Sequence, residues 1–455
     1  MRAPARRIHY AWVVLAASVP VVFGALGLAR FSYTVILPSM QQSLGLTNTQ
    51  AGGLATANLI GYLAFSIVGG ALAARYGPRR IVAVGLVLAG AGMALTGLAQ
   101  AFTTAAIWRA LTGAGSGASN VPVMGLLSSW FAARRRGLAS GIAVMGASLG
   151  LIVVGLLVPA ILSARDAVGG EGWPPLEASG GWRVSWLLFG GVTLAIALVG
   201  YVLLRDRPRE KGLRPLGEGD GTVDPEDSRT VQPPDPGGAP LAKPALSRGE
   251  GPGGLQWGLV YRSPVVWHLG VVYSAFGFAY ITYMTFFTKF LISESGYSQE
   301  AAGSLFMTMG WFTLLSGLMW GVVSDAVGRR GTMVTVYLVQ AAAIALFGLR
   351  PAPLGLTLSA ILFGLTAWSL PTIMAATCGD VFGPRLAPAA LGFVTLFFGL
   401  GQAIGPSVVG AMADAAKTFS PGFLLAGFVS IVGAAGALML RMPSGKQEGA
   451  APPIG

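Results

Sequence analysis

The chain has 455 residues, of which 53% are hydrophobic and 11% are charged, whereas soluble domains carry about 25% charged residues. This composition excludes an ordinary soluble protein and indicates one that lies in a lipid bilayer. The net charge of +12 would suggest a nucleic-acid partner in a soluble protein, but the basic residues here follow a topological pattern, so none is expected. The single cysteine, Cys378, excludes an internal disulfide and any cysteine-rich metal site.

Apolar stretches of about 20 residues, the length that a helix needs to cross the hydrocarbon core, recur along the whole chain. The first follows a basic N-terminus, but it is longer than the apolar region of a signal peptide, so we interpret it as a retained helix. Twelve spans are predicted, at 12–36, 51–73, 81–101, 104–131, 138–162, 184–204, 265–291, 301–323, 332–349, 354–378, 389–412 and 421–440.

The basic residues between these spans are distributed asymmetrically. When the segments are numbered alternately inside and outside, the inside segments hold 23 of the 30 Lys and Arg residues. The outside segments hold five, namely Arg165, Arg183, Lys289, Arg350 and Lys417. Because cytoplasmic loops carry an excess of basic residues, both termini are predicted to be cytoplasmic, in the cell's inner membrane.

The composition changes abruptly after the sixth span, where Gly, Pro and charged residues dominate. Such a segment cannot bury enough apolar surface to order itself, although its first dozen residues could lie as an amphipathic piece on the membrane surface. The predicted domains are a six-helix bundle at 1–204, a cytoplasmic linker at 205–262, a second six-helix bundle at 263–441 and a cytoplasmic tail at 442–455.

The two halves also look related to each other. Shifting the second half by 251 positions superimposes glycines at equivalent places in the second, fourth and fifth helices of each half. An internal duplication is the interpretation that this pattern favours. The superimposed pairs are Gly70 and Gly321, Gly77 and Gly328, Gly113 and Gly364, Gly141 and Gly392, and Gly150 and Gly401.

A glycine and arginine motif follows the second span of each half, as GGALAARYGPRR and WGVVSDAVGRRG. The glycines permit a tight turn, and an acidic residue can pair with basic groups or with a helix N-terminus to hold one conformation. The arginines could alternatively serve only to anchor the loops on the cytoplasmic side. The motif residues are Gly70, Gly77, Arg79 and Arg80 in the first copy and Gly321, Asp325, Gly328, Arg329 and Arg330 in the second.

These motifs resemble the loop signature of the major facilitator superfamily, although Ala74 stands where an acid is usual in the first copy. The fourth span, with Arg109 ahead of spaced glycines, resembles the fourth-helix motif of the same superfamily, where the arginine either has a transport role or bonds carbonyls of a neighbouring helix. The resemblance covers residues 10–441 apart from the linker. It implies an all-α fold of twelve transmembrane helices in two pseudo-symmetric bundles, transport by alternating access and no enzymatic activity.

Within the superfamily, the chain is most similar to the bacterial monocarboxylate-transporter-like branch, which includes the YbfB/YjiJ type and is related to the oxalate/formate carriers. The likeness lies in the glycine-lined fifth helix and in the GLARF segment of the first helix. Animal monocarboxylate carriers have an Asp and an Arg in helix 8, but the segment 305–321 has neither. A proton and lactate mechanism of that kind is therefore not expected.

Arg30 is the most informative residue, because it lies within the first span. A guanidinium there costs roughly 2.5 to 3.5 kcal/mol on insertion scales, so it is a functional-site candidate. No Asp or Glu lies in the interior of any predicted span. An anion that binds and leaves would explain a cation without a counter-ion, while the alternative is that Arg30 reaches the outer surface or bonds backbone carbonyls.

Other polar and aromatic residues in the spans could line a substrate cavity with Arg30, or could simply pack. His268 could titrate near neutral pH, although a lone histidine is more often structural. The candidate substrate-binding residues are Arg30, Tyr33, Asn58, Tyr62, Asn120, Tyr280, Tyr283, Trp311, Trp368 and Gln402.

The sequence thus predicts a monomeric carrier of small organic anions, monocarboxylates above all, coupled to protons or working by exchange. An efflux carrier for lipophilic drugs is the alternative, but a cationic drug would prefer an embedded carboxylate. An embedded enzyme would need an acid pair, a nucleophile with its base, or a metal cluster, and the chain offers none of these patterns. The expected partners are the anion and the lipid bilayer, with no cofactor.

Overall fold

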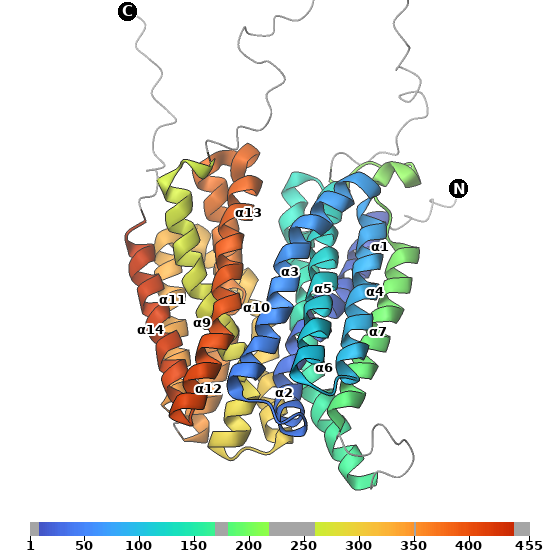
Figure 1. The fold of residues 1–455 in the computed structure, drawn as a ribbon. Coiled ribbons are helices and arrows are strands. Elements are labelled where there is room, and N and C mark those ends of the chain that lie inside the picture. Colours follow the sequence, from blue (N-terminus) through green and yellow to red (C-terminus); the bar gives the residue numbers. More distant parts are fainter. Residues whose placement is uncertain (1–8, 169–180, 218–259, 350–351, 441–455) are drawn as a thin grey trace, which may run out of the picture.

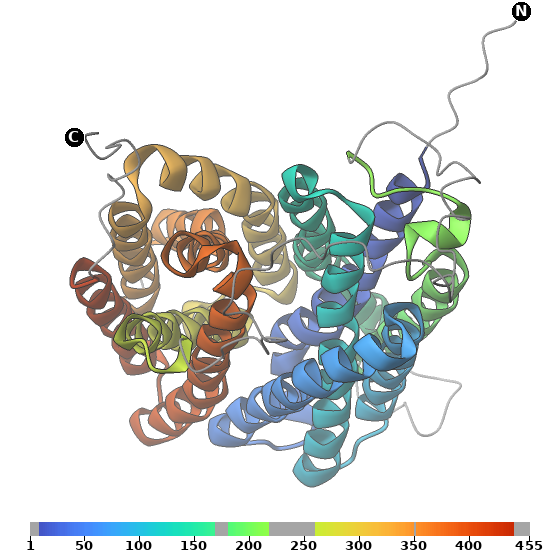
Figure 2. The same ribbon diagram turned by 90° about the horizontal axis from the view of Figure 1, so that it is seen from above.

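The computed structural model describes residues 9–168, 181–217, 260–349 and 352–440, and these ranges are helical almost throughout. The helices form two bundles that stand side by side (Figures 1 and 2). This arrangement confirms the prediction of an all-α membrane fold with two halves. Eleven helices or joined helices in the described ranges are long and apolar enough to cross a membrane.

The first bundle starts with one long span that contains a change of helix type. Its parts are α1 (Tyr10–Val22), the π-helix η1 (Phe23–Phe31) and α2 (Ser32–Ser43). The other helices of this bundle are α3 (Asn48–Tyr76), α4 (Pro78–Gly97), α5 (Phe102–Trp130), α6 (Ala133–Val168) and α7 (Gly181–Leu203).

The α5 helix corresponds to the predicted span 104–131, which is the one predicted span missing from these eleven apolar helices. At 29 residues it is long enough to cross the bilayer. Arg109 and a series of Ser, Thr and Gly residues make it less apolar, and it packs between α3 and α4. The prediction of twelve spans therefore agrees with the helices, and α5 belongs to the interior of its bundle.

The second bundle repeats the plan of the first. Its helices are α9 (Pro264–Ser295), α10 (Gln299–Val327), α11 (Arg329–Gly348), α12 (Pro353–Thr366), α13 (Ser369–Ala416) and α14 (Ser420–Leu438). The α13 helix is broken at Gly383, where φ is 71°, so α12 and the first part of α13 together form one span. The break at Gly383 lies between the predicted spans 354–378 and 389–412, whereas the break between α12 and α13, at residues 367–368, falls inside the first of them and is not revealed by its sequence.

The two copies of the glycine motif adopt the same backbone conformation. Gly77 joins α3 to α4 with φ 91° and ψ 136°, and Gly328 joins α10 to α11 with φ 95° and ψ 150°. Both φ values are positive, in a region that favours glycine. The match supports the internal duplication at the point where the 251-residue shift superimposes these two residues.

The first part of the predicted linker is ordered against the first bundle. Residues 205–217 pack on this bundle through the 3₁₀ helix η2 (Pro208–Lys211) and backbone hydrogen bonds between Leu216 and residues 130 and 132. The Trp130 indole also donates to the Arg205 carbonyl over 2.7 Å. The remaining linker residues, 218–259, and the tail, 442–455, lie outside the described residues.

The bundles meet at one end of the molecule and separate toward the other. We call the end that carries the two glycine and arginine motifs the arginine-rich end, which is uppermost in Figure 1, and the other the opposite end. At the opposite end, Asp414 of α13 accepts hydrogen bonds from the backbone amides of Asn48 and Thr49, over 2.9 and 2.8 Å. Gln299 also donates to the Val35 carbonyl over 3.0 Å.

The distance between α6 and α10 also changes along the two helices. A Cβ placed on Gly155, near the opposite end, would lie 2.6 Å from the Gly303 carbonyl oxygen of α10. A Cβ on Gly141, two turns from the start of α6, would come no closer than 4.0 Å to Leu318 of that helix. The α6 and α10 helices are therefore packed more closely near the opposite end than near the arginine-rich end.

Candidate functional site

The π-helical segment η1 places Arg30 at the interface of the two bundles. The i→i+5 hydrogen bonds of a π-helix make its turns wider than those of an α-helix, and such segments are frequent at functional sites. The segment is closely packed, because a Cβ on Gly27 would lie 2.7 Å from the Gly150 Cα of α6. The chain can therefore hold this conformation only because both positions are glycine.

Side chains of α5 accompany the irregular segment. The Arg109 Nη1 donates to the Ala29 carbonyl over 2.9 Å, and the Ser116 hydroxyl donates to the Ala25 carbonyl. Arg109 is almost fully buried, with its guanidinium above the rings of Tyr33 and Trp186. Of the two roles considered for Arg109, bonding the carbonyls of a neighbouring helix is the one that this geometry supports.

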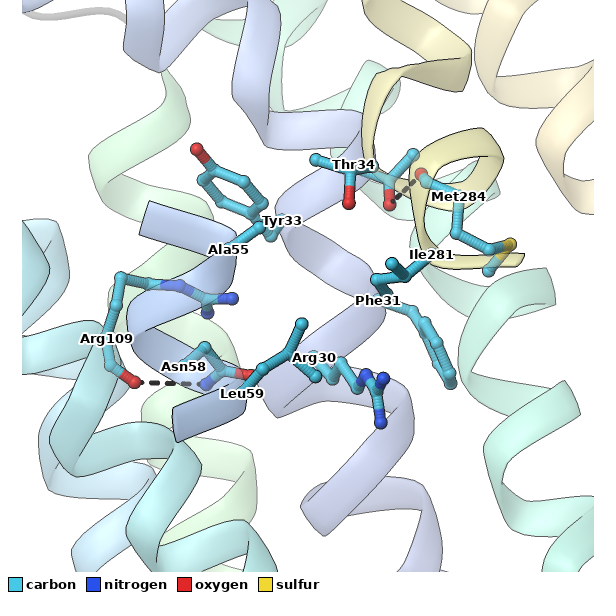
Figure 3. Close-up of a pocket in the computed structure, with 11 residues that line it drawn as sticks. Arg30, Phe31, Tyr33, Thr34, Ala55, Asn58, Leu59, Arg109, Ile281 and Met284 are labelled. Atoms are coloured by element: carbon cyan, nitrogen blue, oxygen red, sulfur yellow. Dashed lines mark hydrogen bonds between the residues drawn. The ribbon is translucent and has the colours of Figure 1, made fainter. Parts of the chain in front are cut away.

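Arg30 has a different environment from Arg109. Figure 3 shows its side chain extending away from Arg109. Its Nη2 donates to Oε1 of Gln402, in α13 of the second bundle, over 2.7 Å. The guanidinium also lies 5.7 Å from the ring centres of Phe31 and Tyr62. Among the described residues, no carboxylate forms an ion pair with Arg30.

Six of the ten candidate residues come together around this guanidinium. Tyr280 of α9 interacts electrostatically with Arg30 and packs its ring against Trp368, with centres 5.9 Å apart. Asn120 of α5 donates to the Tyr62 hydroxyl over 3.0 Å. We call this group the interbundle cluster, and it consists of Arg30, Tyr62, Asn120, Tyr280, Trp368 and Gln402.

The cluster borders the space between the bundles. Arg30, Tyr62, Asn120 and Trp368 are each partly exposed, although they lie in the interior of their spans. Gln402 and Tyr280 are buried, at 2% and 1% exposure. The cluster therefore combines partly exposed and fully buried side chains from both bundles.

Two candidates, Tyr33 and Asn58, lie on the far side of Arg30, beside Arg109. With Arg30 they line a cavity of about 10 Å³, which has room for about one water molecule. The Tyr33 hydroxyl donates to the Ala51 carbonyl over 2.7 Å, and the Asn58 amide donates to the Arg109 carbonyl over 3.0 Å (Figure 3). Both side chains thus hold helices together and have little room for a ligand.

The last two candidates lie outside the cluster. Tyr283 is buried within the second bundle, where its hydroxyl meets Ser359 at 2.8 Å and its ring stacks on Phe363. Trp311 is 55% exposed and shares a helix face with the exposed Leu315, Leu318 and Val322. Residues at this spacing form one exposed stripe of α10. Trp311 therefore does not belong to the interbundle cluster.

The two glycine and arginine motifs have different acidic partners. In the second copy, Arg329 pairs with Asp325 and with Asp380, over 2.5 and 2.8 Å. In the first copy, where Ala74 replaces the acid, Asp206 of the linker accepts from the Arg79 backbone amide over 2.6 Å. Arg80 and Arg330 are exposed, and a Cβ added to Gly70 or Gly321 would lie 3.5 Å or more from other groups. The start of the linker therefore supplies the acid that the first motif lacks.

Several contributing residues have no signal in the sequence. Phe31 packs against Trp368 with ring centres 5.9 Å apart, and the Trp368 indole donates to Ser148 of α6 over 3.0 Å. Asp206 and Asp414 are far in the chain from the helix ends that they cap. Only the fold brings these partners together.

Comparison with protein families agrees with the fold. The family model described as Major Facilitator Superfamily matches residues 21–310. A second model, described as Uncharacterised MFS-type transporter YbfB, matches residues 258–439.

Curated relatives cover most of the chain. The hexuronate transporter of Bacillus subtilis is 25% identical over 89% of this chain and 88% of its own length. Monocarboxylate transporter 11 of Homo sapiens is 26% identical over 93% of this chain and 81% of its own. A probable sulfoacetate transporter of Cupriavidus necator is 24% identical over 90% of each chain.

Solved structures share the fold. A bacterial homolog of the human lysosomal transporter Spinster, in an inward-facing and unoccupied conformation, matches with a TM-score of 0.74 and 16% identity. The match covers 96% of this chain and 97% of that one. A mutant of the nucleoside transporter NupG matches with a TM-score of 0.68 and 13% identity, over 94% of this chain and 99% of that one. With two six-span bundles, paired glycine motifs and a family model that matches more than half of its length, the chain belongs to the major facilitator superfamily of membrane transporters.

Proposed function

We propose that the chain is a secondary transporter of small organic anions, monocarboxylates in particular, in which Arg30 binds the substrate carboxylate. The observation that carries the proposal is the position of Arg30 at the interface of the bundles, with Gln402 as its hydrogen-bonding partner and no counter-ion among the described residues. A buried cation normally has a charged partner, because its desolvation is costly. A substrate anion would fill that role.

The relatives support the substrate class. Those that cover most of the chain are named for hexuronate, sulfoacetate and phosphoglycerate, which are all anions. The cluster offers no carboxylate to a lipophilic cation, so the alternative of a carrier for cationic drugs has no feature of the site in its favour.

Alternating access is the transport mechanism that we propose for this site. We assign the arginine-rich end to the cytoplasm on the positive-inside rule, so that the conformation described above is open to the inside. The substrate would contact Arg30 in one bundle and Tyr280 and Gln402 in the other. Its release would let the bundles close at the arginine-rich end and open at the opposite end.

The orientation can be tested with reporter fusions. Fusions after Leu204 and after Arg441 should report the cytoplasm, in an inner membrane with both termini inside. Periplasmic phosphatase activity at either junction would contradict this topology.

Transport can be tested in proteoliposomes loaded with purified protein. Uptake of radiolabelled pyruvate, 3-hydroxybutyrate and glucuronate should exceed that of protein-free liposomes for at least one of these anions, and tetraphenylphosphonium should not be carried. Uptake of the cation without any of the anions would replace this proposal by the drug carrier.

A further inference from the structure

Four buried polar atoms of the interbundle cluster have no hydrogen-bonding partner. They are Arg30 Nε, Asn120 Oδ1, the Tyr280 hydroxyl and Gln402 Nε2. Buried polar atoms in proteins are nearly always paired, so each exception needs an explanation. Four of the fourteen such atoms in the described residues belong to this one cluster, and a ligand would supply their partners.

Three of these atoms can donate a hydrogen bond, and they come from both bundles. Arg30 Nε belongs to the first bundle, while the Tyr280 hydroxyl and Gln402 Nε2 belong to the second. An ionised carboxylate only accepts hydrogen bonds and has about four lone-pair positions for them. These three donors therefore suit one carboxylate group.

The positive charge of the cluster can neutralise only one carboxylate group. Arg30 is its sole cationic member. Arg109, the other arginine in the vicinity, is engaged by the Ala29 carbonyl and by the rings of Tyr33 and Trp186. A second carboxylate on the substrate would be desolvated without a counter-charge, which is costly.

The fourth atom, Asn120 Oδ1, needs a hydrogen-bond donor as its partner. Asn120 uses its Nδ2 to donate to the Tyr62 hydroxyl, over 3.0 Å, so that Oδ1 remains as an acceptor. A carboxylate cannot donate to this oxygen, but a hydroxyl group can. Asn120 lies further than Arg109 along α5 toward the arginine-rich end, with Tyr62 between it and Arg30.

We propose, on the basis of the transport function above, that the substrate is a hydroxylated monocarboxylate. Its carboxylate binds Arg30, Tyr280 and Gln402, and its hydroxyl donates to Asn120 Oδ1. The rings of Phe31 and Trp368, which pack edge to face across the interface, would contact the carbon chain of the substrate. Asn120 is thereby the residue that distinguishes a hydroxy acid from its deoxy analogue.

The test compares matched ligands on the full-length protein in lipid nanodiscs by calorimetry. The probes are 3-hydroxybutyrate, butyrate and 3-methoxybutyrate, of which the last keeps the oxygen but has no proton to donate. The hydroxy acid should bind at least about tenfold more tightly than both analogues, because a ligand without the hydroxyl proton leaves a buried acceptor unpaired. Malate, a hydroxylated dianion, should bind more weakly than 3-hydroxybutyrate.

Two variants separate the roles of the residues. Asn120→Leu should remove the preference for the hydroxy acid, so that 3-hydroxybutyrate and butyrate bind with similar affinities. Tyr280→Phe should weaken both ligands by a similar factor, since it removes a donor to the carboxylate that they share. Gel filtration and melting temperature confirm that each variant is folded, and the wild-type comparison of the three probes needs no variant at all.

The outcomes separate this inference from the proposed function. Equal affinities of the wild type for 3-hydroxybutyrate and butyrate, with binding of both lost in Arg30→Gln, would overturn the hydroxyl assignment and keep the anion carrier. If folded Asn120→Leu still preferred 3-hydroxybutyrate to butyrate, the hydroxyl assignment would likewise be overturned and the anion carrier kept. Binding that does not depend on Arg30 would overturn both.

Discussion

Arg30 Nη2 of the first bundle donates a hydrogen bond to Gln402 Oε1 of the second bundle, over 2.7 Å. Without substrate, the amide oxygen thus takes one of the positions that a carboxylate oxygen would occupy. The bond also joins the two halves that must move relative to each other. Gln402 is therefore a candidate for binding the anion, and its amide oxygen occupies a position that an anion oxygen would take.

Gln402→Glu should weaken anion binding. The new carboxylate would pair with Arg30 in a desolvated environment and neutralise the only cation of the cluster. Affinity for a carboxylate in nanodisc calorimetry should fall by more than about tenfold, which corresponds to 1.4 kcal/mol. Gln402→Leu is the matched control, and because it adds no charge it should retain measurable binding. Equal affinities of Gln402→Glu and the wild type would exclude this role.

Arg109→Ala should destabilise the fold, because it leaves the Ala29 carbonyl of the π-helical segment without its donor. An unpaired buried carbonyl costs about 1 to 3 kcal/mol. We expect a lower melting temperature in detergent together with lost transport, whereas Arg30→Gln should keep the wild-type melting temperature. If Arg109→Ala melted like the wild type and still failed to transport, a direct substrate contact would be the better explanation.

Closure at the opposite end depends on Gly52. A Cβ at this position would lie 2.1 Å from the Pro406 carbonyl oxygen of the other bundle, so Gly52→Ala should push the bundles apart there. The measurement is labelling of a cysteine at Thr285, a buried residue beside the small cavity, in a Cys378→Ser background. An impermeant thiol reagent applied from outside should react faster in Gly52→Ala.

The control for this experiment is Gly125→Ala, because a Cβ on Gly125 meets no atom within 4 Å. Its labelling rate should equal that of the parent. Identical rates in Gly52→Ala and in the parent would show that the contact with Pro406 does not hold the outer side closed.

His268 should not carry the coupled proton. Its Nε2 lies 2.9 Å from the Gly436 carbonyl oxygen of α14, and it is twelve residues before Tyr280 on α9, a distance of about 18 Å along a helix. Transport in proteoliposomes should change little in His268→Ala, and any stimulation by acid should persist. Loss of the proton dependence with intact substrate binding would show that this histidine, rather than the weak-acid substrate, carries the proton.

The fold was predictable from the sequence because its signals are local. The apolar stretches give the spans, and Gly77 and Gly328 mark the repeated turn that only a positive φ allows. The break between α12 and α13 and the π-helical segment were not predictable, since they depend on packing. Gly27 reveals its role only when Gly150 lies against it.

Part of the site was also predictable from local signals in the sequence. Arg30 is conspicuous because it is a charge in an apolar span, and six of the ten candidates do gather around it. Trp311 could not be distinguished from Trp368 by residue type, since the direction of each side chain follows from how its helix packs. Asp206 gave no signal, because its partner Arg79 is more than 100 residues away in the chain.

The binding of a carboxylate by Arg30 variants tests the central claim most directly. Arg30→Gln keeps a polar side chain but loses the charge, and Arg30→Lys keeps the charge but loses the planar fork that can bind a carboxylate through two hydrogen bonds. With folded protein in nanodiscs, we predict no detectable binding by Arg30→Gln and partial binding by Arg30→Lys. Wild-type affinity in Arg30→Gln would show that the anion binds elsewhere and would contradict the account.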